Sequence, residues 1–229
     1  MLVNYIQQRQ KMFEESNNFY TPSGIHVYTK DVMLNDLVDL EKVIANLESK
    51  LPHHIIDGVE MIIIGHFDEF DERGINAFYK DSALYVSNIQ SDNDDLLDDL
   101  VHETAHSAEE NYGMEIYADQ EMKDEFLRKR IHLYNILRKM GFNPSREMFL
   151  DVEYDQNFDE YLLEDVGYDK LSEILKGIMI SPYAATSLRE YFATGFTEFY
   201  LYPDSHGYLQ KISPELYKKL VLLHHLGEA

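Results

Sequence analysis

The order of strand-like and helix-like patterns constrains the fold of this 229-residue chain more than any other feature. Three strand-like patterns lie before residue 88: the β-branched and aromatic run 25–29, the apolar run 59–64, and the alternating segment 75–87, which reverses around Lys80-Asp81. Most of the chain after residue 90 repeats apolar residues at helical spacing. Because strands followed by helices are typical of the α+β class, we expect a small early sheet and a mostly helical C-terminal half.

Helical spacing, together with helix start and stop signals, predicts helices over residues 1–15, 31–51, 91–112, 121–140, 168–180, 181–200 and 213–226. The Ser-Pro pairs that begin at Ser181 and Ser213 offer a cap followed by proline at the first helical position. The acidic segment 151–165 has no clear period, and we expect it to be irregular. No repeat or Pro/Gly-rich linker divides the chain, so residues 1–229 are predicted to form a single domain.

Composition excludes several classes of protein. The chain has 20 Lys and Arg against 42 Asp and Glu, a net charge of −22. Such a surface repels phosphate backbones and anionic lipids, so neither nucleic acid nor a membrane is expected as a partner. A cationic partner remains open, and so does solubility as the whole explanation of the charge. Cysteine is absent, which excludes disulfides and thiolate metal ligands.

The helix predicted over residues 91–112 contains an H-E-x-x-H pattern made by His102, Glu103 and His106. Four residues turn a helix by about 400°, so the two imidazoles lie on one face, one turn apart. That spacing lets two nitrogens reach one tetrahedral Zn²⁺. Glu103 lies beside them, where its carboxylate can accept a proton from water acidified by zinc. The alternative is an amphipathic helix that carries these residues by chance.

A catalytic zinc needs a third protein ligand. The extended H-E-x-x-H-x-x-G-x-x-H pattern is absent, because the chain has Glu109 and Tyr112 at the two later positions. A glutamate from a later helix is the other common solution, and the acidic candidates are Glu109, Glu110, Glu115, Asp119, Glu190 and Glu198. Glu109 and Glu110 follow His106 too closely to fold back to a ligand position, so we expect them to support the site or to face solvent.

Residues 183–193 resemble the third-ligand segment of the anthrax lethal factor-like zinc peptidases, a group that includes the Pro-Pro endopeptidases. In that segment a Tyr precedes a Glu by seven positions, and two aromatics and Ala follow the Glu. Residues 100–106 resemble the helix motif of the same family. The resemblance implies a zincin-like domain of the Glu-zincin type. It also implies the following site residues: zinc ligands His102, His106 and Glu190, general base Glu103, and oxyanion-stabilising hydroxyl Tyr183.

The chain departs from this family in two respects. Thr194 stands four residues after Glu190, where the family usually has a second Glu. The loss of that glutamate could lower zinc affinity unless Glu198 or Glu109 substitutes for it. The separation of His106 and Glu190 also exceeds the family's usual spacing, so residues 115–180 are expected to form a helical insertion beside the cleft. Residues 187–190 match a capping box as well, in which Glu190 would bond backbone N–H instead of metal.

These patterns lead us to expect a zinc-dependent endopeptidase that binds an extended peptide along an edge strand, at residues 75–78 or 84–86. The acidic composition favours basic substrates, and the resemblance implies proline-adjacent bonds. No secretory signal or membrane-spanning run is visible, so a cytoplasmic or virus-encoded intracellular protein is expected. The alternatives are a catalytically weak or inactive acidic interaction protein on a zincin fold, and an acidic mimic of nucleic acid.

Overall fold

The computed structural model describes residues 18–228 and divides into two compact units between Ala108 and Glu109. We call residues 18–108 the sheet unit and residues 109–228 the helical unit. The helix expected over residues 1–15 lies outside the described residues. All described strands belong to the sheet unit, which confirms the α+β class. Because one domain can contain two compact units, the single-domain expectation stays a prediction.

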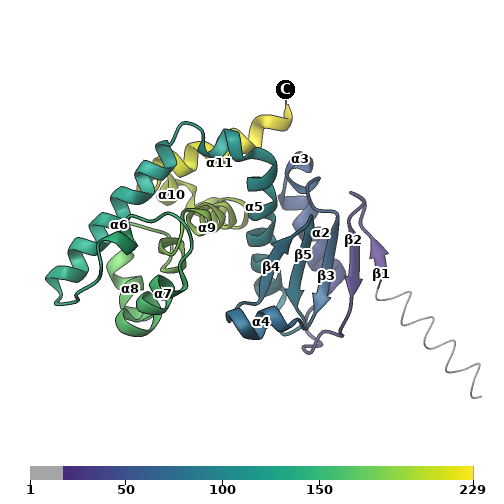
Figure 1. The fold of residues 1–229 in the computed structure, drawn as a ribbon. Coiled ribbons are helices and arrows are strands. Elements are labelled where there is room, and N and C mark those ends of the chain that lie inside the picture. The colour runs from purple at the N-terminus through teal and green to yellow at the C-terminus, as the bar shows by residue number, and fades with distance from the viewer. Residues whose placement is uncertain (1–17, 229) are drawn as a thin grey trace, which may run out of the picture. The chain divides into compact units, whose positions relative to one another are not determined.

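The sheet unit is built on a five-stranded mixed sheet (Figure 1). Its strands are β1 (Asn18–Tyr20), β2 (His26–Thr29), β3 (Met61–Gly65), β4 (Ala77–Lys80) and β5 (Ala83–Ser87), in the spatial order β1-β2-β3-β5-β4. β2, β3 and β5 run parallel to one another, while β1 and β4 pair antiparallel at the two edges. The three predicted strand regions are confirmed, whereas β1 was not predicted.

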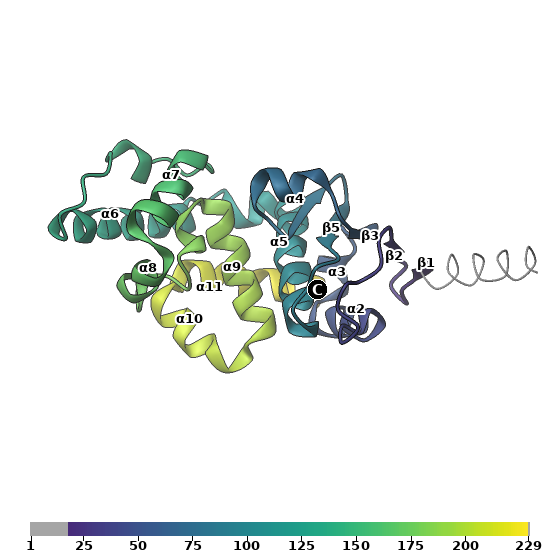
Figure 2. The same cartoon turned by 90° about the horizontal axis from the view of Figure 1, so that it is seen from below.

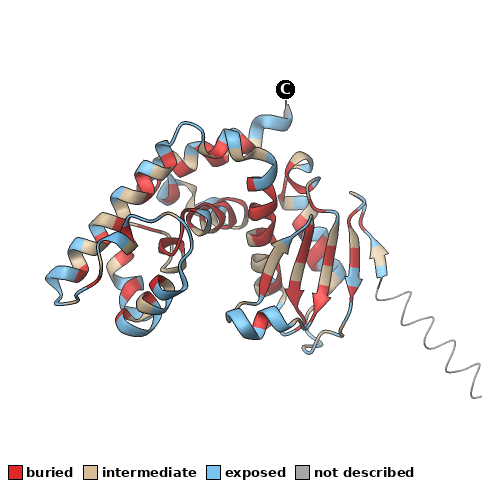
Figure 3. Ribbon diagram, viewed as in Figure 1, coloured by how far each residue is buried: buried red, intermediate tan, exposed pale blue. Residues whose placement is uncertain are grey.

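One face of this sheet consists of buried apolar side chains. Figure 3 shows the buried residues of the strands in red. The strand register places Val27, Ile62 and Leu84 in one row, and all three are 0% exposed. The opposite face is aromatic: the Phe78 and Tyr85 rings stack at 4.6 Å, and aromatic side chains at the start of α4 (Asp68–Arg73) pack against them. The alternation of the two sets of side chains explains why these segments form strands.

The β4–β5 hairpin determines which strand is available at this side of the sheet. Its turn residues Asp81 and Ser82 have φ of 50° and 59°, as a two-residue hairpin with the matching twist requires. β4 is the edge strand, whereas β5 pairs with β3 on one side and with β4 on the other. Residues 84–86 are therefore wrong as an edge, and of the two expected segments only 75–78 overlaps the edge strand.

The helix predicted over residues 31–51 is shorter than expected. α2 covers Leu40–Lys50 and is capped by the Asp39 side chain, which accepts a hydrogen bond from the Lys42 backbone N–H at 3.1 Å. Residues 31–39 form a loop instead, because their backbone bonds to the segment after β5: the Leu34 N–H donates to the Asn88 carbonyl at 3.0 Å. The short helix α3 (His53–Ile56) follows α2 and was not predicted.

α5 (Asn93–Tyr117) is the long helix predicted over residues 91–112, and it runs five residues beyond that end. Asp92 caps its start, since the Asp92 carboxylate accepts from the N–H groups of Asp94 and Asp95 at 2.9 and 3.0 Å. The backbone departs from helical geometry at Tyr112, with φ −122° and ψ 23°. The predicted end at residue 112 therefore coincides with a kink, and a further helical stretch follows it to Tyr117.

The helical unit contains α6 (Glu121–Lys139), α7 (Gln156–Glu160), α8 (Tyr168–Leu175), α9 (Leu188–Leu201), α10 (His206–Ile212) and α11 (Pro214–His225). α9 packs against α6, α10 and α11 (Figure 2) and supplies the apolar core of the unit with aromatic side chains that are 0% exposed, Tyr191, Phe192 and Phe196. No helix among residues 18–228 combines the length and the apolar character that a membrane crossing requires.

Three predictions in the helical unit need correction. The segment 151–165 was expected to be irregular, but α7 and a π-helix (Tyr161–Val166) occupy it from Gln156 onward, and the Asp155 side chain caps α7. The helix predicted over residues 168–180 ends at Leu175. The helix expected to open at Ser181 begins only at Leu188, because the capping side chain is that of Ser187.

The start of α11 is capped from another helix. Ser213, the expected cap, makes no capping bond; its hydroxyl accepts from the Lys129 ammonium at 2.6 Å. The buried Glu125 carboxylate on α6 accepts instead from the backbone N–H groups of Glu215 and Leu216 at 3.0 and 3.3 Å. A carboxylate at a helix N-terminus satisfies free N–H donors and complements the helix dipole, so Glu125 fastens α11 to α6.

Candidate metal centre

α5 presents the two histidines of the H-E-x-x-H pattern together. The ring centroids of His102 and His106 are 5.3 Å apart, with their planes at 78°. This arrangement follows from helical spacing, since residues four apart stand one above the other. Apolar neighbours on the same helix, Leu100, Val101 and Ala105, are 0% exposed, so the backbone that carries the rings is held by the core.

Glu190 comes from the first turn of α9. The Ser187 side chain accepts a hydrogen bond from the Glu190 backbone N–H at 3.1 Å, which is one half of the capping box expected over residues 187–190. Arg189, between them, is anchored to Glu109. The capped turn fixes the backbone from which the Glu190 carboxylate extends.

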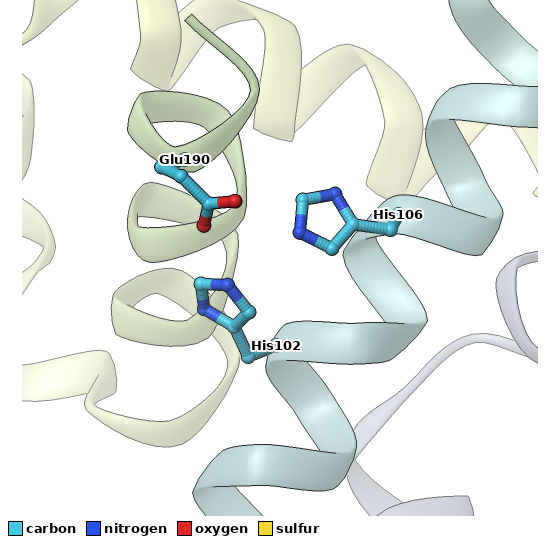
Figure 4. Close-up of side chains that lie close together, drawn as sticks. All are labelled: His102, His106 and Glu190. Atoms are coloured by element: carbon cyan, nitrogen blue, oxygen red, sulfur yellow. The ribbon is translucent and has the colours of Figure 1, made fainter. Parts of the chain in front are cut away.

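His102, His106 and Glu190 form a group that could hold a metal ion (Figure 4). One ligand atom from each residue lies within 4.8 Å of the ligand atoms of the other two. None of the three side chains is fully exposed, so water competes less for these donors than on an open surface. Glu198 and Asp119, also considered as third ligands, do not belong to this group; Asp119 instead accepts from the Lys219 ammonium at 2.6 Å.

The remaining two predicted site residues have different settings. Glu103 is 7% exposed on α5, directly after His102. Tyr183 is half-buried and opens the 3₁₀ helix Tyr183–Ala185, five residues before α9 begins. The Tyr183 carbonyl accepts from the Thr186 backbone and hydroxyl, which holds this turn in place. Their roles as base and hydroxyl donor stay predictions.

A buried polar network adjoins the Glu190 turn and was missed in the sequence. The Arg189 Nε donates to Glu109 Oε2 at 3.1 Å, and the Tyr117 hydroxyl donates to Glu109 Oε1. The Glu109 side chain is only 6% exposed, so both interactions compensate a charge removed from water. Burial, followed by the charge of Glu109, raises the pKa of Tyr117. Glu109 and Tyr117 are eight residues apart, beyond the three- or four-residue spacing at which helical side chains meet, so the sequence did not indicate their contact, and nothing local pointed to Arg189.

The pKa of Asp99, another acid on α5, is raised above its usual value. Burial raises the pKa of Asp99 to about 6, against the lowering effect of the Gln90 side chain, which donates to Asp99 Oδ2 at 2.9 Å. The charges of Asp95, Glu103 and Asp98 raise it further. Asp99 precedes Glu103 by one helical turn, so part of the acidic character of this helix face is neutralised when Asp99 is protonated.

No protein-family model, curated protein or solved structure matches this chain.

Proposed function

We propose that this protein is a zinc-dependent endopeptidase of the Glu-zincin type. The observation that carries the proposal is the group His102, His106 and Glu190, in which two imidazoles and one carboxylate bring their ligand atoms within 4.8 Å of one another. Two His and one Glu, with a further position left for water or substrate, are the usual donors of a catalytic zinc in peptidases.

The spacing of these donors suits zinc. Tetrahedral coordination at about 2.0–2.1 Å places ligand atoms about 3.3 Å from one another. Each of the three side chains has at least two rotatable bonds on a helical backbone, which lets its donor atom adjust toward a bound ion. The absence of thiolates and the mixed N and O donors favour zinc over softer metals.

The residues around the metal position would divide the work of hydrolysis. When bound, zinc supplies Lewis acidity that polarises the scissile carbonyl and makes water more acidic. The Glu103 carboxylate accepts a proton from the attacking water and later delivers it to the leaving amine. The Tyr183 hydroxyl donates a hydrogen bond to the oxygen on which negative charge develops. Glu103 is buried, so little bulk water reaches its carboxylate. Exclusion of water strengthens the electrostatic interactions of the proton transfer and of the hydrogen bond to the oxyanion.

The resemblance of residues 100–106 and 183–193 to the lethal factor-like peptidases supports the same proposal and adds a zincin-like fold. In this proposal the edge strand β4 binds an extended peptide by main-chain hydrogen bonds. The net charge of −22 favours basic side chains in the substrate, and the resemblance favours bonds next to proline.

A second candidate is a non-catalytic acidic interaction protein that keeps the metal group. Thr194, in place of the second glutamate of the family, is the observation that favours it, because a lost carboxylate next to a metal site weakens the orientation of the ligands. In the helical unit, however, Glu109 bonds to the residue beside Glu190 and offers another means of fixing that turn.

The test combines metal analysis with cleavage of an unbiased peptide library. We expect the purified full chain to bind about one zinc and to cleave peptides. Glu103→Gln keeps the ligands and should retain zinc while losing cleavage by about 10²–10⁴-fold. Glu41→Gln, an exposed glutamate in the first turn of α2, makes the same chemical change away from the metal group and serves as control.

Each outcome separates the candidates. Zinc binding with cleavage that depends on Glu103 supports the peptidase. Zinc binding without cleavage by the wild-type chain favours the interaction protein. Absence of zinc binding, or cleavage that is unchanged in Glu103→Gln, contradicts the proposed mechanism.

A further inference from the structure

The helical unit contains a hollow of about 400 Å³ that the proposed peptidase site does not use. Its walls come from α6 and from the chain segments that follow α8 and end α10, and the residues that line it are Glu125, Arg128, Lys129, His132, Gly177, Ile178 and Ile212. Three of the seven lining residues are basic, in a protein whose net charge is −22. The concentration of basic groups in one concavity contrasts with the overall acidic composition.

Lys129 is the most constrained of these groups. Its ammonium donates to the Tyr191 hydroxyl at 2.7 Å and to the Ser213 hydroxyl at 2.6 Å. An ammonium has three N–H donors, so one remains for a ligand in the hollow that Lys129 lines. Both partners are neutral hydroxyls. The positive charge is therefore held in place by protein dipoles and is not neutralised by them.

The acid that lines the hollow is already engaged elsewhere. Both oxygens of Glu125 accept hydrogen bonds, from the Tyr191 hydroxyl at 2.7 Å and from the first N–H groups of α11. The N-terminus of α11 carries partial positive charge, which offsets the charge of this carboxylate. Among residues 18–228, Lys129 has no ion pair with any carboxylate.

The Lys129 ammonium has lost part of its hydration and has no ion pair within residues 18–228 to compensate, so its charged form costs free energy. Burial lowers the pKa of Lys129 to about 8, with a further lowering by Arg128 and an opposing effect of Glu125. An anion in the hollow would relieve this cost, since a nearby negative charge favours the charged form of a lysine.

Arg128 and His132 add two further basic side chains to the lining of the hollow. Both side chains are exposed, and they lie one helical turn apart on α6. In the part of the chain that the structure describes, neither forms a hydrogen bond or ion pair with another side chain. A guanidinium and an imidazole next to an ammonium supply donors from several directions, as recognition of a multi-oxygen anion requires.

We propose that this hollow binds a small organic molecule through an oxyanion group, with Lys129, Arg128 and His132 as its donors. A volume of about 400 Å³ exceeds the needs of a bare anion and lies in the range of small-molecule sites. Ile178 and Ile212 offer an apolar wall for the organic part. Phosphate and carboxylate groups share the required chemistry, and the probes below distinguish them.

The experiment titrates the full chain with inorganic phosphate and, separately, with acetate. 1,10-Phenanthroline, a chelator without an oxyanion group, is present throughout, so that a metal at the His102 group does not contribute. Calorimetry measures affinity, and NMR of the lysine side-chain nitrogens follows the titration of Lys129. We expect saturable binding of at least one probe, together with a rise in the pKa of Lys129. Tighter phosphate binding assigns a phosphate group to the ligand, and tighter acetate binding assigns a carboxylate.

Variants locate the binding. Lys129→Met and Arg128→Gln should each weaken binding about tenfold, the usual effect of losing one charge-assisted hydrogen bond. Arg128→Gln and His132→Asn change exposed side chains, so their effects remain informative if Lys129→Met alters folding. Lys139→Gln removes an exposed charge farther along α6, outside the hollow, and should change affinity less than about twofold. Absence of saturable binding by both probes, or equal losses in Lys139→Gln and Arg128→Gln, would overturn the proposal.

Discussion

Arg189 donates from Nε to Glu109 Oε2 at 3.1 Å, across 80 residues of sequence, and the next residue after Arg189 is the candidate ligand Glu190. Within the helical unit this bond joins the later part of α5 to the first turn of α9. The Glu109 side chain is 6% exposed, whereas that of Arg189 is 57% exposed. The carboxylate of the pair is therefore buried, whereas solvent partly screens the charge of the guanidinium.

We expect Glu109 and Arg189 to be energetically coupled. In a double-mutant cycle with Glu109→Gln and Arg189→Gln, the coupling in free energy of unfolding should be about 1–2 kcal/mol, because either single change leaves a partly buried partner unsatisfied. Urea denaturation measures it. The pair Lys218 and Glu215 on α11, 2.7 Å apart, provides the control: the Lys218 side chain is 64% exposed and that of Glu215 is 23% exposed, and the coupling should be less than about 0.5 kcal/mol.

The same variants test whether the pair positions the Glu190 turn. Loss of a contact that orients a metal ligand typically lowers metal affinity by about tenfold. We therefore expect zinc to bind about tenfold more weakly to Arg189→Gln, with no such change in Lys218→Gln. Unaltered zinc affinity in Arg189→Gln would restrict the pair to a role in stability.

Zinc should stabilise the folded chain through the three candidate ligands. At a free zinc concentration 100 times the dissociation constant, binding contributes about 2.7 kcal/mol, which corresponds to a rise in melting temperature of about 5–10 °C for a chain of this size. Glu190→Ala should lose most of this rise. Glu198→Ala, on the same helix but outside the metal group, should keep it. Differential scanning calorimetry with and without zinc compares the three proteins, and an equal response of the two variants would contradict the ligand assignment.

Asp99 predicts a pH dependence of stability. Its pKa in the folded protein is about 6, above the usual 3.8, so the folded state binds this proton more tightly than the unfolded state. Ionisation of Asp99 therefore costs folding free energy, and its contribution to stability declines as pH rises from about 4 to about 6. Asp99→Asn should be more stable than the wild type above pH 6, by about 1–3 kcal/mol, and the advantage should vanish near pH 4.

Chemical denaturation at several pH values between these limits measures the effect. Asp94→Asn, an exposed acid in the first turn of the same helix, is the control for a generic change of charge. A stability difference between Asp99→Asn and wild type that is constant with pH would show that the carboxyl titrates normally.

Local patterns predicted the parts of this fold that are held by local interactions. The β4–β5 hairpin follows from alternation around a two-residue turn, and α6 follows from apolar periodicity with stop signals. The loop at residues 31–39 has helical periodicity too, yet it bonds to residues after β5, such as Asn88. Periodicity carries no information on such distant partners, so the start of α2 was placed too early.

The candidate site likewise has a part that the sequence predicts from local geometry and a part that it does not. His102 and His106 are adjacent because of helix geometry, which the sequence contains in full. Glu190 could be chosen among six acidic candidates only through a family resemblance, since no local rule links α9 to α5. Capping by Glu125 was missed for the same reason, because Ser213 offered a plausible local cap and the acceptor came from α6 instead.

The contact between α9 and α11 gives a last prediction, which concerns packing alone. A Cβ added to Gly195 would lie far inside van der Waals contact with Leu216 Cδ2. Leu216 is 0% exposed and its backbone N–H is bonded to Glu125, so it has little freedom to withdraw. Gly195→Ala should therefore lower the free energy of unfolding by about 1–3 kcal/mol, the usual cost of overpacking. At Gly113, on α5, an added Cβ would meet nothing within 4 Å, and Gly113→Ala should be neutral or stabilising by up to about 1 kcal/mol. Equal effects of the two substitutions in urea denaturation would mean that α9 and α11 are not in close contact in solution.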